Sequence, residues 1–192
     1  MTYVDTNDYV MGTTLEPGFA SETIDLLFDY LRIAGERNYA DFGGDLAESS
    51  NTNLERRLED IQRTISSASM HFPNGFATGL RRQFANLLDE DAWEEEDELP
   101  GMLAVSTFLR VLYQTAKSRR PGIGANGRGS ISAFWTNGDN RLTVECLPGD
   151  RTTWVLTRVY DNGETERAAG ECSSGRLNEV IGPYSPEVWF DQ

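Results

Sequence analysis

The chain has 192 residues, 39% of them hydrophobic, with 31 acids against 17 bases and a formal net charge of −14. Four Trp, nine Phe and seven Tyr can fill a hydrophobic core, which excludes a disordered tail. The acidic balance lacks the basic surface of a nucleic-acid-binding protein, so we expect no direct nucleic-acid binding.

The first residues and the hydropathy pattern indicate in which cellular compartment the protein is expected. No apolar run reaches the roughly 18–20 residues that a membrane span needs. Residues 1–12 carry two acids and no base before an apolar stretch, unlike an export signal. Two cysteines make no disulfide framework. We therefore expect a cytoplasmic protein with no membrane partner.

Helical periodicity dominates the first part of the chain. After an irregular arm at residues 1–19, apolar side chains recur every three or four residues in four stretches. The second stretch starts at Thr52-x-x-Glu55, which has capping-box spacing, and the fourth ends in the bases Lys117, Arg119 and Arg120. The expected helices cover residues 21–34, 52–68, 76–88 and 100–120.

The pattern changes after residue 120. Residues 121–129 hold four Gly and one Pro and are interpreted as a linker. Beyond them the apolar period becomes two, with turns at residues 137–138, 148–150 and 161–163. We predict an α+β chain with three parts: an acidic helical domain at 1–120, a Gly-rich linker at 121–129, and a four-stranded antiparallel β-meander with a short helix at 130–192. One sheet face is expected to take that helix, and the other the helical block or a partner.

No catalytic or cofactor-binding motif stands out. His71, the single histidine, comes just before Pro73 at a predicted helix end, where a structural or capping role is favoured over a catalytic one. Cys146 alternates with apolar residues in a predicted strand and is interpreted as a core residue. Residues 122–127 match GxGxxG in letters only, because a helix precedes and strands follow. We predict no catalytic residues, no metal and no cofactor.

Residues 89–98 are the strongest candidate site. They supply eight carboxylates, no base and one aromatic, Trp93. The charge would steer a basic protein partner while the ring buries area against it. Two other interpretations stay open: a solvated loop, or a loop that Trp93 pins to the helical core. The candidate partner-binding residues are Asp89, Glu90, Asp91, Trp93, Glu94, Glu95, Glu96, Asp97 and Glu98.

A weaker candidate lies on the predicted sheet. Arginines on successive strands could line one face and hold an anionic ligand or a partner, with Arg141, Arg158 and Trp154 as the candidate residues. The competing interpretation is that these arginines pair across strands with Glu145, Glu164 and Glu166.

These features lead to three hypotheses for function. The leading one is a non-enzymatic interaction module that binds a basic protein surface, as an inhibitor, antitoxin, immunity protein or complex subunit does. The first alternative is a nucleic-acid mimic that blocks a DNA- or RNA-binding protein. The second is a small enzyme or ligand-binding domain using carboxylates and arginines at the helix–sheet junction.

Overall fold

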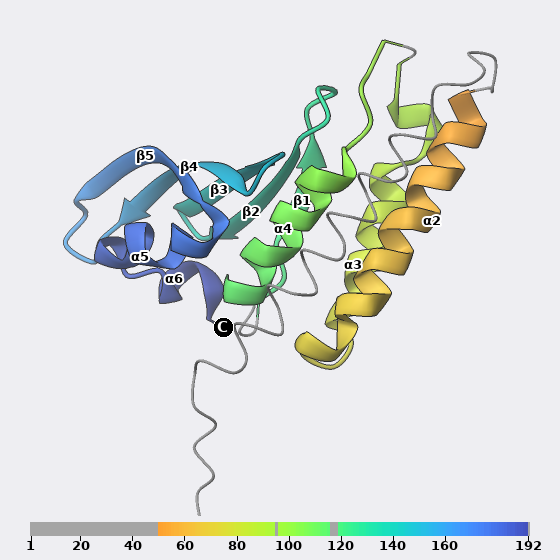
Figure 1. Cartoon of the computed structure of the whole chain (residues 1–192). Coiled ribbons are helices and arrows are strands. Elements are labelled where there is room, and N and C mark those ends of the chain that lie inside the picture. The colour runs from red at the N-terminus through yellow and green to blue at the C-terminus, as the bar shows by residue number, and fades with distance from the viewer. Residues whose placement is uncertain (1–49, 95, 116–118, 192) are drawn as a thin grey trace, which may run out of the picture.

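The computed structural model describes residues 50–94, 96–115 and 119–191. The arm at 1–19 and the helix predicted at 21–34 lie outside the described residues. Within them, three long helices precede an antiparallel sheet, and short helices follow it, which confirms the α+β class (Figure 1). None of the helices in the described part of the chain is long and apolar enough to cross a membrane.

The three long helices follow the predicted apolar stripes. They are α2 (Ser50–Ala68), α3 (Phe76–Leu87) and α4 (Met102–Thr115). α3 begins after Gly75, whose φ of +79° is the left-handed conformation that glycine adopts without steric cost. The fourth helix is shorter than expected: it ends at Thr115, and Arg119 and Arg120 lie outside any helix.

α4 is the central helix of the fold. It contacts α2 on one side and strands β2 and β3 on the other. A helix between two layers needs apolar side chains around most of its circumference. α4 meets this need with six buried apolar residues: Ala104, Val105, Phe108, Leu109, Val111 and Leu112.

The sheet has five strands in the order β1-β2-β3-β4-β5, with every neighbouring pair antiparallel. The prediction of four strands was therefore wrong by one. The missed strand lies inside the stretch interpreted as a Gly-rich linker, and it forms because its backbone pairs with β2. The strands are β1 (Gly122–Ala125), β2 (Ile131–Asn137), β3 (Asn140–Leu147), β4 (Arg151–Val159) and β5 (Thr165–Ser173).

One face of the sheet is buried. α4 and α6 (Glu187–Phe190) contact β2 and β3, while α5 (Leu177–Ile181) contacts β5. Four 3-10 turns complete the described chain: η1 (Ser69–His71), η2 (Glu90–Ala92), η3 (Ser174–Arg176) and η4 (Gly182–Tyr184). The inner face supplies the buried side chains Ile131, Ala133, Trp135, Leu142, Val144, Cys146, Thr152, Trp154 and Leu156.

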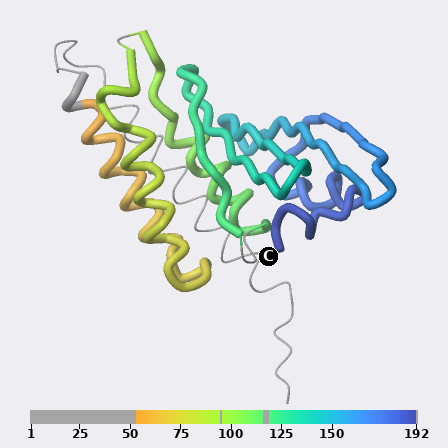
Figure 2. Tube along the Cα trace, turned by 180° about the vertical axis from the view of Figure 1, so that it is seen from behind, coloured from red at the N-terminus to blue at the C-terminus, as the bar shows by residue number. Residues whose placement is uncertain are grey.

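α4 of the helical block and the C-terminal helices share this inner face, so the expectation that the helical block takes the opposite face was wrong. The alternative, that a partner takes that face, stays a prediction. Seen from behind, strands of the sheet pass in front of α4, while α2 and α3 lie to one side of the sheet (Figure 2). The buried side chains of helices and sheet form a single cluster. The division into parts at 1–120 and 130–192 stays a prediction. None of the described helices covers the outer face of the sheet, which we call the open face.

Candidate functional site

Two short turns in the acidic segment, residues 89–98, are closed by hydrogen bonds to its own side chains. Asp89 begins η2, and its carboxylate accepts a hydrogen bond from the amide of Asp91 at 3.3 Å. Asp97 closes a second turn, with Oδ2 accepting from the Glu94 amide at 3.1 Å and its own amide donating to the Glu94 carbonyl at 3.1 Å. Local capping of this kind gives a polar segment a defined backbone without a hydrophobic core of its own.

The end of the acidic segment is joined to the loop between β1 and β2. The Glu98 amide donates to the Gly127 carbonyl at 3.0 Å, and the Gly129 amide donates to the Glu98 carbonyl at 3.1 Å. Glu98 and Arg128 thus form an isolated parallel bridge. Gly127 is required here, since its φ is +66° and an added Cβ would lie 2.3 Å from Oδ1 of Asp97.

Trp93 holds the middle of the acidic segment to the helices. Its ring is half-buried and packs against the core cluster. Its indole Nε1 donates to the carbonyl of Leu87, at the end of α3, at 2.7 Å. This geometry matches the pinning role considered from the sequence. The role of Trp93 as an anchor for a partner stays a prediction.

The described carboxylates of the acidic segment belong to solvent-exposed residues and form no ion pair with a described cation. Apart from Glu95, which lies outside the described residues, every acid of the segment is exposed. Among the described residues none of these acids forms an ion pair, whereas Asp60, Asp150, Glu171 and Glu179 each pair with an arginine elsewhere. The segment therefore presents uncompensated negative charge on a backbone that is fixed at both ends.

Removing the indole tests whether Trp93 orders this segment. We expect Trp93→Ala to raise amide hydrogen exchange across residues 89–98 by about tenfold, because the segment loses its hydrogen bond to Leu87 and its largest packed side chain. Exchange in β3 and β4 should stay as in the unmodified chain. Exchange measured by mass spectrometry that changes nowhere in the segment would contradict the pinning role.

The weaker candidate is divided between the two faces of the sheet. Arg141 is exposed on the open face. Trp154 is 7% exposed on the inner face, where its ring lies 6.3 Å from that of Tyr184. Arg158 is on the inner face too, where its Nη1 donates to Asn140 Oδ1 and to its neighbour's carbonyl, both at 2.9 Å. Arg141 therefore cannot join Trp154 and Arg158 in one site on one face.

The open face carries features that no sequence-based candidate included. Phe134 and Val155 are 41% and 59% exposed, and both point out of this face. Arg151 pairs there with Glu171, and Glu145 accepts hydrogen bonds from Asn126, Ser130 and Thr153. The alternation within each strand could have predicted which residues share this face, since side chains at positions i and i+2 of a strand point to the same face.

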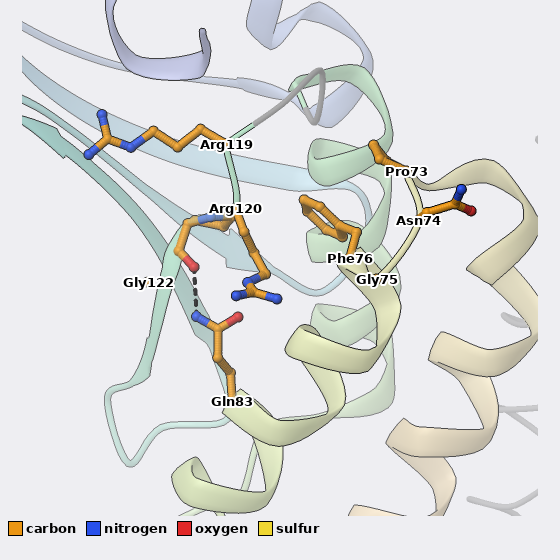
Figure 3. Close-up of a pocket in the computed structure, with 9 residues that line it drawn as sticks. Pro73, Asn74, Gly75, Phe76, Gln83, Arg119, Arg120 and Gly122 are labelled. Carbon is orange, nitrogen blue, oxygen red and sulfur yellow. Dashed lines mark hydrogen bonds between the residues drawn. The ribbon is translucent and has the colours of Figure 1, made fainter. Parts of the chain in front are cut away.

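A cleft of about 590 Å³ lies at the junction of α3 and β1 (Figure 3). In it Gln83 Nε2 donates to the Pro121 carbonyl at 2.8 Å. Arg120 lies against the backbone of α3, where a Cβ on Gly79 would overlap its guanidinium. Arg119 points away and donates to the Thr136 carbonyl. No carboxylate is among the described residues that line this cleft, which are Pro73, Asn74, Gly75, Phe76, Gln83, Arg119, Arg120, Pro121 and Gly122.

Cys146 and His71, the groups considered for catalysis, both pack against neighbouring side chains. Cys146 is fully buried in β3, and burial raises the pKa of its thiol, so the nucleophilic thiolate is disfavoured. The His71 ring lies edge-on to Tyr113, with centroids 5.9 Å apart. Among the described residues no group of three or more His, Cys, Asp and Glu is arranged to hold a metal ion.

Comparisons of the chain with models of protein families, with curated proteins and with solved structures find no match.

Proposed function

We propose that the chain is a non-enzymatic protein-interaction module whose acidic segment binds a basic surface of a partner protein, as inhibitors, antitoxins, immunity proteins and complex subunits do. The observation that carries the proposal is the combination of hydrogen-bonded backbone and unpaired charge at residues 89–94 and 96–98. Ordinary surface acids on a folded chain are interspersed with bases. In this segment, none of the described acids forms an ion pair with a described base.

A fixed backbone favours binding over mere solubility. A segment that is ordered before the encounter loses less conformational entropy when a partner docks. Trp93, Asp89 and Asp97 provide that order through the three side-chain hydrogen bonds described above. Uncompensated charge raises the association rate by long-range steering, and it suppresses binding to acidic proteins.

The test separates the acidic segment from total charge. A segment variant carries Glu90→Gln, Asp91→Asn, Glu94→Gln and Glu96→Gln, leaving Asp89 and Asp97 to form their hydrogen bonds. A matched control variant removes four exposed acids elsewhere through Asp139→Asn, Asp161→Asn, Glu164→Gln and Glu187→Gln. Both variants lose the same charge, so a difference between them reports the position of the charge.

The readout is capture from the cells that produce the protein, quantified by mass spectrometry. We expect the unmodified chain and the control variant to retain the same basic protein, and the segment variant to retain about tenfold less of it, because close charge complementarity is lost. Equal retention by both variants, or retention of an acidic protein, would reject the proposal.

A further inference from the structure

The open face of the sheet has a regular arrangement of charged and apolar side chains. Strand pairing aligns its outward residues in rows that run across the strands. The central row has apolar side chains at three of its positions and contains Gly122, Phe134, Thr143, Val155 and Ala169. Phe134 and Val155 are two of the four large hydrophobic residues that are exposed in the described chain.

The rows on either side of the centre carry opposite charges. One neighbouring row lies two residues from the central row along each strand and contains Thr136, Arg141, Thr157 and Arg167. The row on the other side of the central row, again two residues away along each strand, contains Ser132, Glu145, Thr153 and Glu171. In the described chain neither Arg141 nor Arg167 forms an ion pair, whereas Glu171 forms an ion pair with Arg151. The face is therefore basic on one side of its apolar row, while the other side carries Glu145 and the Arg151–Glu171 ion pair.

This arrangement is complementary to itself. Consider a second copy turned by a two-fold axis that runs along the central row. The rotation leaves each strand opposite the same strand and exchanges the two outer rows. Arg141 then faces Glu145 of the other copy, and Arg167 faces Glu171. On the axis Val155 meets Val155. A two-fold axis along the strands would instead place arginine rows on each other.

The surface is smooth enough for two sheets to stack. The outward positions of β1 are Gly122 and Gly124, and an added Cβ on Gly122 would lie 2.1 Å from the Phe134 ring. The ring therefore lies flat over β1 instead of standing out from the sheet. Five strands about 4.8 Å apart and about 23 Å long present about 500 Å² per copy. The total of about 1,000 Å² is at the lower limit for a specific interface.

We propose that the open sheet face binds a second copy of this chain, in a two-fold symmetric sandwich centred on Phe134 and Val155. The proposal is independent of the partner assigned to the acidic segment, because the two surfaces share no residue. The dimer is weak, since its area is small and two chains of charge −14 repel each other at long range. Screening by physiological salt reduces that repulsion.

Charge reversal on the full chain tests both the face and its symmetry. One variant carries Arg141→Glu and Arg167→Glu, which makes both outer rows acidic. The other carries Glu145→Lys and Glu171→Lys, which makes both rows basic. By sedimentation equilibrium at about 0.15 M salt, we expect each variant alone to dimerise at least about tenfold more weakly than the unmodified chain. Mixed in equal amounts, the two variants should form a heterodimer with affinity restored to near that of the unmodified pair.

An apolar substitution tests the centre of the same face. Val155→Asp places two carboxylates together on the axis and should abolish the dimer. Its control is Met70→Asp, at a residue that is 81% exposed in η1 and off the sheet. Circular dichroism confirms that each variant is folded. An unmodified chain that stays monomeric up to about 500 μM, or a dimer insensitive to Val155→Asp, would overturn the proposal.

Discussion

Trp135→Ala is expected to destabilise the fold by about 3–5 kcal/mol, the range measured when a large aromatic is deleted from a packed core. Trp135 is 1% exposed on the inner sheet face. Its ring meets that of Phe190 edge-on at 5.2 Å, and its Nε1 donates to the Arg119 carbonyl at 3.2 Å. Trp135 therefore connects β2 to α6 through packing and to the chain before β1 through a hydrogen bond. Urea unfolding followed by fluorescence and circular dichroism measures the loss.

The neighbouring residue supplies the control. Phe134→Ala removes an aromatic from the same strand, but from the open face, where the ring is 41% exposed. The expected loss is about 1 kcal/mol, because less apolar area is returned to water. Both variants are compared at low protein concentration so that self-association does not contribute to stability. Equal losses would contradict the assignment of the two faces.

Asp150→Ala is the second substitution with a large expected effect, about 2 kcal/mol. Asp150 ends the turn between β3 and β4 with a φ of +63°, a conformation that Asp tolerates better than Ala. Its carboxylate accepts from the buried Ser174 hydroxyl, and Oδ1 lies 3.3 Å from Nη1 of Arg110. Alanine leaves a buried hydroxyl without its acceptor and adds backbone strain.

Asp150→Asn separates the contribution of the backbone conformation at residue 150 to the stability of the fold from the contribution of the side-chain charge. Asparagine tolerates the same φ and keeps one acceptor oxygen for Ser174, but it loses the charge that faces Arg110. Because the Asp150 side chain is 36% exposed, solvent screens that ion pair and its loss should be small. Thermal unfolding should therefore show less than half of the alanine effect. Equal destabilisation by Asn and Ala would show that the ion pair dominates.

The sequence was sufficient to locate most elements within the described residues. The apolar stripes of α2, α3 and α4 and the alternation in β2, β3 and β4 each follow from side chains within the element itself. β1 could not be found in this way. Its four residues, Gly-Ile-Gly-Ala, carry no alternation of polar and apolar side chains, and only pairing with β2 makes them a strand.

What covers each face of the sheet could not be read from the sequence. Alternation separated Trp154 from Val155, but both faces of β4 carry apolar residues. The choice depends on α4 and the C-terminal helices meeting on one side, which is a property of tertiary packing. The charged rows of the open face depend likewise on strand register, which aligns Arg141 with Thr157 and Arg167.

The acidic segment was visible from composition, but its order was not. A run of acids is typical of a solvated loop, and the sequence left the direction of Trp93 undecided. The deciding contacts involve the Leu87 carbonyl and the backbone of the β1–β2 loop. Backbone partners of this kind leave no residue-type signature in the sequence.

The most direct measurement of the proposed function is the salt dependence of the association rate with the captured partner. Stopped-flow kinetics would compare the unmodified chain, the segment variant at Glu90, Asp91, Glu94 and Glu96, and the matched control variant. We predict that the segment variant associates about tenfold more slowly at low salt, with a flatter salt dependence, while the control stays close to the unmodified chain. Identical rates and slopes for the segment and control variants would contradict the assignment of the partner site to the acidic segment.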